Sequence, residues 1–393
     1  MAAASPTLPE WLNYSRLQPH LVTVLGTLSE RERIRATARQ ASYQRSNPSR
    51  AHRFSRLLPA LSSKPDYASR YAVSVGGSPD HERENRYSDI IPYDRTRVVV
   101  SSTGLEKGGM DSAESRYLNA NWVRELAGGK WWIATQAPLP NTAHTFLSAI
   151  MQPVTWLEPA SSNASVSKVS RIRTVVQLTQ NFESGMRKAH VYFPEEEGQS
   201  WNVFPDKGSV APTLKVTLIR ATLIEEAQCV KSTVSIEPLT SSHVDPVVFT
   251  HLLYGSWPDH GIPSAQNRES LLRFIRLVDD VNRDLSSQPI TVDLDPNPPI
   301  MVNCSAGVGR TGAFIALSSL LRANGFLRPA GTSSQEPPLT PSPLGPLPQG
   351  MQDDLVAQEI DMLREQRPGM VQRDSQVTFI YEMLLAAFGH PVD

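Results

Sequence analysis

Short apolar runs recur along the chain and predict the strands of a buried sheet. The clearest run, Pro299 to Val302, is apolar throughout, as expected of a central strand that is covered on both faces. The other runs mix β-branched and aromatic residues, which favour strands. We expect strands at 97–100, 117–123, 130–135, 173–178, 214–224, 248–254 and 299–302.

Between these runs, apolar residues at spacings of three and four predict helices. The clearest is 264–282, in which Leu271, Phe274, Ile275 and Val278 fall on one face. A further helix is expected directly after Gly312. We expect the others at 141–151, 353–366 and 374–388, the last of them capped by Asp374.

The N-terminal region is predicted to hold one short helix. Ser29 and Glu32 stand at capping-box spacing, which predicts a helix from Ser29 to about Ala41. Residues 1–10 are expected to form a tail, and 46–78 an irregular arm around the core. The helix is rich in arginine, and we expect its solvated face to carry Arg31, Arg33, Arg35 and Arg39.

Two segments look like insertions. Residues 155–168 are polar, and the stretch at about 328–350 is rich in proline and is predicted to be a disordered loop. The second contains Thr340-Pro341-Ser342-Pro343, which suits contact with an SH3 domain or a proline-directed kinase. The predicted organisation is therefore an N-terminal tail, helix and arm over 1–82, packed on one large domain over 83–390.

The stretch from Cys304 to Gly312 joins a strand to a helix and is rich in glycine. Such a loop points successive backbone N–H groups, and the positive end of the helix, at one small volume, which makes an anion cradle. Cys304 lies at its mouth, where these groups favour thiolate over thiol. Arg310 offers a planar fork for two phosphoryl oxygens, and Thr311 could hydrogen-bond the sulfur. These residues predict thiolate attack on phosphorus through a phosphocysteine intermediate.

Two other interpretations of this stretch are weaker. A lone cysteine is most often a small buried hydrophobe, but Cys304 stands beside a nest of N–H groups and not on an apolar face. Gly307 to Gly312 also has the spacing of a dinucleotide-binding loop, which needs a second strand ending in Asp or Glu about 20 residues on. A proline-laden stretch follows instead.

A second informative stretch runs from Tyr254 to Gly261. A tryptophan that can anchor a hinge, a stiff proline, the acid Asp259 and a flexible glycine suit a lid that carries one carboxylate. By itself, the stretch fits a surface turn before the next helix at least as well.

Composition narrows the classes of function. The chain has 393 residues, 40% of them hydrophobic, and a net charge of −1, which gives no sign of nucleic-acid binding. No apolar run approaches the ~20 residues that cross a bilayer, and the N-terminus lacks the features of a secretory signal. Two cysteines, Cys229 and Cys304, allow neither a disulfide framework nor a Cys/His metal site. We expect a cytoplasmic protein that needs no cofactor.

Motifs along the chain, from Arg83 to about Phe388, resemble in order and spacing those of the tyrosine-specific protein phosphatases of the cysteine-dependent class. The stretch from Cys304 to Gly312 resembles their phosphate loop, and Trp257 to Asp259 resembles their acid lid. We expect a non-receptor, fungal-like member. The other matching stretches are 85–87 (phosphotyrosine-recognition loop), 117–120 (substrate-side strand), 136–138 (strand-to-helix corner), 183–194 (the loop whose lysine braces the lid), and the two glutamines 372 and 376.

The resemblance implies an α/β fold: a single domain with a highly twisted, mixed central β-sheet flanked by helices. It implies hydrolysis of phosphotyrosine in proteins, with Cys304 as nucleophile, Asp259 as general acid and then base, and Gln372 positioning the water. Tyr87 would stack on the substrate ring, so that only an aryl phosphate is long enough to reach the sulfur. The remaining implied site residues are Arg310 and Thr311 in catalysis, and Asn85, Lys188, Ser305, Ala306, Gly307, Val308, Gly309 and Gln376 in substrate binding.

One departure from the family leaves a second interpretation open. The family usually has a histidine directly before the nucleophile, and this chain has Asn303. A catalytically weak phosphotyrosine-binding module is therefore the alternative. A phosphoinositide phosphatase would favour a lysine inside the loop, and Ser305 to Gly309 contains none.

Overall fold

The structure is a computed structural model that describes residues 8–14, 18–46, 65–102, 115–154, 170–240, 244–259, 261–286, 288, 294–331 and 339–390. Its strands are β1 (Arg97–Ser101), β2 (Ser115–Arg124), β3 (Trp131–Thr135), β4 (Thr174–Gln177), β5 (Phe182–Glu183), β6 (Met186–Arg187), β7 (Ser200–Val203), β8 (Thr213–Ile224), β9 (Cys229–Leu239), β10 (Val247–Tyr254) and β11 (Ile300–Asn303).

Its α-helices are α1 (Glu10–Tyr14), α2 (Gln18–Ser46), α4 (Pro65–Arg70), α5 (Ala143–Met151), α6 (Ala265–Arg283), α7 (Gly309–Ala323), α8 (Leu355–Gln366) and α9 (Asp374–Ala387). Four short 3-10 turns cover Pro79–Glu84, Asp94–Thr96, Glu225–Ala227 and Gln349–Met351.

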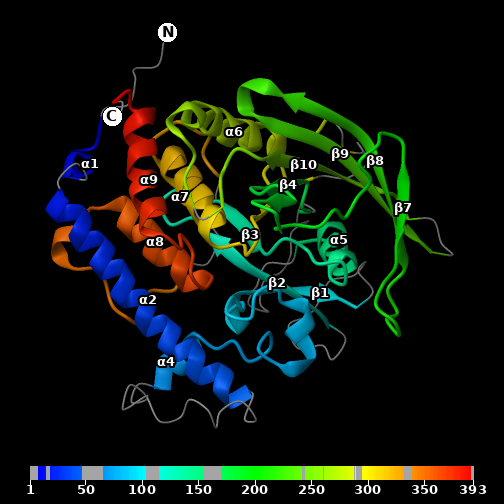
Figure 1. Cartoon of the computed structure of the whole chain (residues 1–393), viewed down its shortest axis with the longest axis horizontal. Coiled ribbons are helices and arrows are strands. Elements are labelled where there is room, and N and C mark those ends of the chain that lie inside the picture. The colour runs from blue at the N-terminus through cyan, green and yellow to red at the C-terminus, as the bar shows by residue number, and fades with distance from the viewer. Residues whose placement is uncertain are drawn as a thin grey trace, which may run out of the picture.

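A nine-stranded mixed sheet forms the centre of the molecule (Figure 1), in the order β1-β2-β3-β11-β4-β10-β9-β8-β7. The four central strands run parallel, since β11 pairs in parallel with both β3 and β4, and β4 pairs in parallel with β10. Their carboxyl ends therefore meet at one edge of the sheet, where loops can bring side chains together. The other strands of this sheet pair antiparallel, and β5 and β6 form a separate hairpin.

Helices cover both faces of the sheet. Ile300 and Val302 of β11 pack into a core shared with α6, α7, α8 and α9, whereas Met301 points into a second core shared with α5. This alternation explains why β11 is apolar throughout, because both of its faces are buried. The α/β fold with a mixed central sheet flanked by helices is confirmed.

Apart from the N-terminal helix, the expected strands and helices form within a few residues of their predicted bounds, but four strands were missed: β5, β6, β7 and β9. β9 buries Cys229, Ser232, Val234 and Ile236, places more exposed residues between them, and has polar residues at five of its 11 positions. A strand with one wet face shows no continuous apolar run. β7, at the sheet edge, has no buried residue. Asp374 is the first residue of α9 and not its cap.

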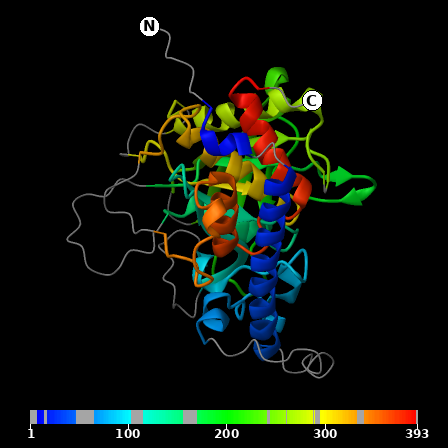
Figure 2. The same cartoon turned by 90° about the vertical axis from the view of Figure 1, so that its left-hand side faces the viewer.

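The N-terminal helix is longer than predicted. α2 starts at Gln18, so Ser29 and Glu32 lie inside it and do not cap it. The reason is tertiary: Val24 and Leu28, upstream of the predicted start, are buried in the same core as α8 and α9 (Figure 2). Within the arm expected at 46–78, residues 65–70 form α4; residues 47–64 lie outside the described part.

Two of the four arginines of this helix are not on a solvated face, contrary to the prediction. Arg35 is 0% and Arg31 8% exposed. Arg31 donates to both carboxylate oxygens of Asp361 on α8, at 2.9 and 2.8 Å. Arg35 donates to Asp361 at 2.6 Å and to Glu365 at 2.9 Å. We call these four residues the arginine clamp, because they fasten α2 to α8.

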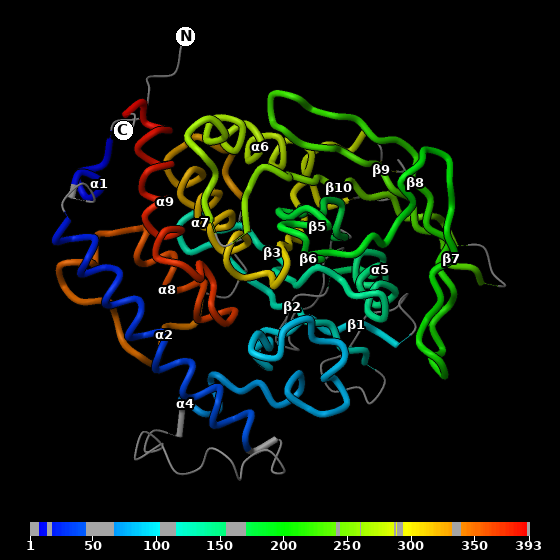
Figure 3. Tube along the Cα trace, in the orientation of Figure 1, coloured from blue at the N-terminus to red at the C-terminus, as the bar shows by residue number. Residues whose placement is uncertain are grey.

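The proline-rich segment is not a disordered loop where it is described, over residues 339–350. Figure 3 shows its orange trace beside α2 and α8. Arg31 donates to the carbonyl oxygen of Gly345 at 2.8 Å, and the Ser342 hydroxyl donates to Glu365 at 2.7 Å. Carbonyl groups of the segment thus accept hydrogen bonds from the buried Arg31. The amino-acid composition of the segment does not show that such a donor lies beside it. The insertion predicted at 155–168 lies outside the described residues.

Candidate active site

The predicted phosphate loop, Cys304 to Gly309, follows the carboxyl end of β11 and leads into α7. Gly307 has a φ of +72°, and a Cβ there would lie 2.0 Å from the carbonyl oxygen of Thr135. A Cβ on Gly312 would lie 2.4 Å from the backbone nitrogen of Val371. Only glycine fits at either position, so the sequence pattern here follows from close backbone approach.

Carbonyl groups of the loop are turned away from its centre. The buried guanidinium of Arg367 donates to Gly307 O at 2.8 Å and to Ala306 O at 3.1 Å, and the N–H of Ala137 donates to Ser305 O at 3.0 Å. Holding carbonyl oxygens outward leaves N–H groups to line the cradle, which is what an anion requires.

Cys304 is buried and lies where the loop meets α7. Burial by itself raises the pKa of a thiol, but here the pKa of Cys304 is lowered. The opposing causes are the charge of Arg310, the side chain and backbone N–H of Thr311, and the N–H of Val308. The Thr311 hydroxyl has no hydrogen-bond partner elsewhere in the described part of the chain, and it is among the groups that lower the pKa of the Cys304 thiol. The site therefore favours a thiolate.

Arg310 is 3% exposed and is held by an acid from another part of the chain. Glu183 of β5 accepts two hydrogen bonds from its guanidinium, at 2.7 and 3.1 Å. Arg310 also donates to the carbonyl oxygen of Trp257 at 2.8 Å and to Asp259 at 3.0 Å. Although burial opposes it, the thiol of Cys304 and these carboxylates raise the pKa of Arg310. A fork fixed in this way is pre-oriented for a tetrahedral anion.

The predicted lid lies over the cradle and not on an open surface turn. Trp257 is fully buried, packs edge-on against Phe379 with ring centroids 5.7 Å apart, and donates to Gly261 O at 3.1 Å. Asp259 forms an ion pair with Lys188, which follows β6. The lid carboxylate, the lysine of the 183–194 loop and Arg310 thus meet at one point.

At the mouth of the site, the hydroxyl of Tyr87 lies 2.9 Å from Ser305 Oγ, which itself donates to Lys188 O at 2.7 Å. Asn85, predicted to contact substrate, hydrogen-bonds residues outside the recognition loop. Its amide donates to Gly76 O at 2.8 Å and its oxygen accepts from Tyr117 at 2.7 Å. These bonds brace the recognition loop, and substrate contact by Asn85 stays a prediction.

The two predicted glutamines lie over Gly309. A Cβ on Gly309 would stand 3.0 Å from Gln376 Nε2 and 3.5 Å from Gln372 Cβ. Gln372 is exposed, whereas Gln376 is buried and accepts from the N–H of Arg373 at 3.2 Å. The geometry therefore leaves Gln372 the freer of the two to bind water.

Asn303 is fully buried behind the nucleophile. Its amide donates to the carbonyl oxygen of Cys304 at 3.1 Å, and its Oδ1 has no partner in the described part of the chain. The side chain thus fixes the loop backbone but contributes no charge to the thiol.

Three residues of the site were not predicted. Glu183 and Gln136 belong to the matching stretches 183–194 and 136–138 but have no predicted role there, and no pattern singles out Arg367. Gln136 accepts from the N–H of Arg86 at 2.8 Å and donates to Glu84 O at 2.7 Å, which locks the recognition loop. Polar residues of this kind carry no periodicity, so only their position in space identifies them.

None of the described His, Cys, Asp and Glu residues gather in threes around a volume suited to a metal ion. The described helices include none with the length and apolar character needed to span a membrane.

Comparison with known proteins gives relatives of one kind. The human receptor-type tyrosine-protein phosphatase eta is 30% identical over 259 residues, which are 66% of this chain and 15% of that protein. The human tyrosine-protein phosphatase non-receptor type 18 is 25% identical over 314 residues, 80% of this chain and 53% of that protein. The chain thus spans only part of the length of these relatives, and the non-receptor, fungal-like subtype stays a prediction.

A solved structure has a similar fold. It is the one reported as "Structural basis of PTPN18 fingerprint on distinct HER2 tyrosine phosphorylation sites", with a TM-score of 0.54 and 22% identity over 81% of this chain and 87% of that chain. The family model described as protein-tyrosine phosphatase matches residues 81–157 and 165–324. Because that match covers more than half of its residues, the chain belongs to the protein-tyrosine phosphatase family, whose members are hydrolases.

Proposed function

We propose that the protein hydrolyses phosphotyrosine in other proteins, with Cys304 as nucleophile. The observation that carries the proposal is the meeting of a thiol of lowered pKa, a pre-oriented Arg310 and the lid carboxylate of Asp259 at one cradle. These three groups supply what thiol-based phosphoryl transfer requires: a nucleophile, a cation for the phosphoryl oxygens and an acid for the leaving group.

In the first step, the thiolate attacks phosphorus, so that an S–P bond forms as the P–O bond to the phenol breaks. Arg310 and the loop N–H groups hold the equatorial oxygens, where charge spreads in the transition state. Asp259, in its protonated form, gives the leaving phenolate a proton. Lys188 steadies that carboxyl group from the side.

In the second step, water attacks the phosphocysteine, the S–P bond breaks, and the thiolate is restored. Asp259 now takes a proton from the water, and Gln372 orients it. Tyr87, at the mouth, is placed to stack on the substrate ring and set the depth of the cleft. A phosphoserine would leave its phosphorus short of Cys304.

The alternative of a weak binding module rests on Asn303 alone. Burial raises the pKa of the Cys304 thiol, but Arg310, Thr311 and Val308 together lower it by more, so the net pKa is lowered with no charge at residue 303. Capture without turnover would require neither Asp259 nor Gln372. These considerations favour the enzyme.

The test is turnover of a tyrosine-phosphorylated peptide, compared with a phosphoserine peptide and a panel of phosphoinositides. We expect release of phosphate from the first substrate only. Cys304→Ser should abolish turnover and keep peptide binding, because a serine hydroxyl stays protonated near neutral pH. Binding without turnover by the unaltered protein would support the binding module, and preference for an inositide would contradict the proposal.

We further propose that residues 83–390 are the catalytic domain, and that 1–82 is an arm packed on it. The arginine clamp and the burial of Leu12, Val24 and Leu28 in the main core support this division. A thiol nucleophile needs a reducing compartment, which supports a cytoplasmic location.

For the proline-rich segment, we propose a contact with a proline-directed kinase in preference to an SH3 domain. The carbonyl groups of Thr340 and Gly345 are taken up by Arg70 and Arg31, at 3.2 and 2.8 Å, and an SH3 domain would need the extended segment free of them. Thr340, which precedes a proline, is exposed. Incorporation of labelled phosphate at Thr340 by such a kinase would test the contact, and its absence would contradict it.

A further inference from the structure

A second cavity lies in the sheet away from the phosphate loop. It has a volume of about 350 Å³ and is bounded by β8, β9, β10, the end of α6 and the residue before β4. In the register of the sheet, Arg220, Thr233 and Thr250 form one row, and Thr222 and Lys231 belong to the next. We call this cavity the distal pocket. Val281, in the last turn of α6, also lines this pocket.

A β-bulge directs side chains of β8 into this pocket. Leu218 pairs with Val234, but the next paired residues are Arg220 and Thr233, so Ile219 is an extra residue. Leu218 and Val234 face the core shared with α5. Without the bulge, Arg220 would face that side too. The bulge turns Arg220, and the alternate residues after it, to the α6 side, where they line the pocket. Bulges of this kind commonly re-aim side chains beside functional sites.

The pocket carries unbalanced positive charge. Arg173 is 5% exposed, and its terminal nitrogens donate to two carbonyl oxygens, of Asp295 at 2.7 Å and Asn282 at 2.8 Å. Its buried Nε has no partner in the described part of the chain. Burial lowers the pKa of Arg173. The charges of Asp295 and Asp284 offset this only in part, and neither carboxylate forms an ion pair with Arg173 in the described part of the chain. An anion bonded to the buried guanidinium would therefore be stabilising.

Two more cations line the same volume. Arg220 and Lys231 have no ion pair with any residue that the structure describes. The one acid of the lining, Asp284, is exposed to solvent and accepts a hydrogen bond from the N–H of Ser286 at 2.9 Å. The three cations therefore outnumber the acid, and threonine hydroxyls stand between them.

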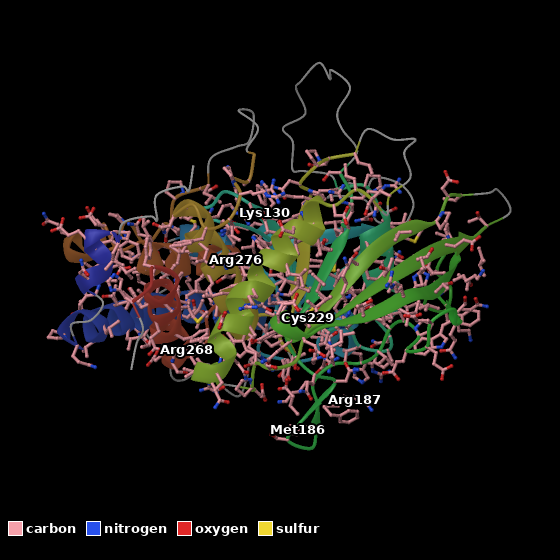
Figure 4. The ribbon with its side chains drawn as sticks, turned by 90° about the horizontal axis from the view of Figure 1, so that it is seen from above. Lys130, Met186, Arg187, Cys229, Arg268 and Arg276 are labelled. Carbon is pink, nitrogen blue, oxygen red and sulfur yellow. The ribbon has the colours of Figure 1, made fainter. Side chains whose placement is uncertain are left out.

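The distal pocket is separate from the active site. It lies at the amino ends of β4 and β10, whereas the phosphate loop and the lid follow the carboxyl ends of the parallel strands. From Thr250 to Tyr254 alone, β10 spans roughly 13 Å. Figure 4 shows the hairpin of Met186 and Arg187 on the same side of the molecule as Arg268, at the start of α6, and Lys130 toward the other end of that helix. Glu183, which holds Arg310, belongs to the same hairpin.

We propose that the distal pocket binds the phosphate group of a small phosphomonoester. Its volume is at the low end of the ~300–1,000 Å³ usual for small-molecule sites, which suits a compact ligand. Arg173 and Arg220 supply guanidinium forks, Lys231 a point charge, and Thr222 and Thr233 hydroxyl donors for phosphate oxygens. The proposal does not depend on catalysis at Cys304.

The test is calorimetric titration with inorganic phosphate and with glycerol 3-phosphate. The active site also suits phosphate, so the starting protein is Arg310→Met, which loses the catalytic fork. We expect this variant to bind one equivalent of each probe. Adding Arg220→Met and Lys231→Met should weaken that binding at least tenfold. These two side chains lie outside the catalytic machinery, so their substitution in the unaltered protein should leave phosphotyrosine turnover unchanged.

Lys215→Met in the Arg310→Met protein is the matched control. Lys215 is also a cation of β8, but its side chain is 43% exposed and pairs with Glu237 at 3.6 Å outside the pocket. It should leave the affinity unchanged. The proposal is overturned if the Arg310→Met protein binds neither probe, or if its affinity is indifferent to Arg220 and Lys231. If a phosphopeptide bound through Arg220 and Lys231 while neither probe did, the pocket would be a substrate site, and the proposal would also be overturned.

Discussion

Arg35→Met tests whether the arginine clamp holds α2 to the catalytic domain. The guanidinium of Arg35 is fully buried and bonds Asp361 at 2.6 Å and Glu365 at 2.9 Å. Methionine keeps much of the volume and removes the charge, which leaves Glu365 buried beside Arg70 at 3.4 Å. Breaking a buried ion pair by removing one partner costs about 3–5 kcal/mol. We expect a loss of that size in the free energy of unfolding.

Urea denaturation followed by circular dichroism measures this loss. The matched control is Arg33→Met on the same helix, where the arginine side chain is 59% exposed and pairs with Glu30. Surface pairs of this kind contribute about 0–1 kcal/mol, so Arg33→Met should be nearly neutral. If Arg35→Met cost no more than Arg33→Met, the clamp would not stabilise the fold, and our reasoning from its burial would be refuted.

The same clamp predicts a dependence on pH. Burial alone would raise the pKa of Asp361 and Glu365, but in the folded state both pKa values are lowered. Hydrogen bonds and charge from Arg31 and Arg35 lower that of Asp361, and the charge of Arg35 with hydrogen bonds from Tyr71, Ser342 and Arg35 lowers that of Glu365. Their contribution is therefore fully present above the unfolded pKa values, near about 4, and is lost as the pH falls through the lower folded values. The unaltered protein should lose stability on acidification below that point, and Arg35→Met should lose less. An equal loss in both proteins would mean that other groups control acid unfolding.

Three further predictions concern the site and its support. Asp259→Ala should lower turnover by ~10²–10⁴, and more for a phosphotyrosyl peptide than for para-nitrophenyl phosphate, whose phenolate leaves more easily without a proton; equal losses would point to another acid. Asn303→His should lower the pKa of Cys304, because an imidazole adds positive potential; each pKa unit corresponds to about 1.4 kcal/mol between thiol and thiolate. The rate of inactivation by iodoacetate across pH measures this pKa, and an unchanged value would show that backbone N–H groups and Arg310 alone set it. Ser342→Ala should cost about 1–2 kcal/mol of unfolding free energy, since its hydroxyl bonds the carboxylate of Glu365 at 2.7 Å; no change in the urea midpoint would mean that this contact is not stabilising.

The sequence by itself determined the features that are local along the chain. From Cys304 to Gly312 the chain passes from the end of a strand, through a nest of N–H groups, to the start of a helix. Gly307 and Gly312 are needed because a Cβ at either position would collide with backbone atoms. The acid of the lid, Asp259, stands out from its neighbours Trp257 and Pro258, although its place over the cradle depends on the contacts with Arg310. Strands buried on both faces, such as β11, show in the sequence as apolar runs. Each of these patterns depends on residues a few positions apart, which is the range over which a sequence can be interpreted directly.

The tertiary structure decided which distant groups meet. Arg35 lies on a helix rich in charge and looks solvated, because its partners Asp361 and Glu365 are 326 and 330 positions away. Glu183 and Arg367 likewise act on the phosphate loop from separate elements. A charged side chain costs free energy when buried alone and little when paired, and its sequence neighbours do not say which applies. Only the packing of α2 on α8, and of the β5–β6 hairpin on the cradle, settles that pairing.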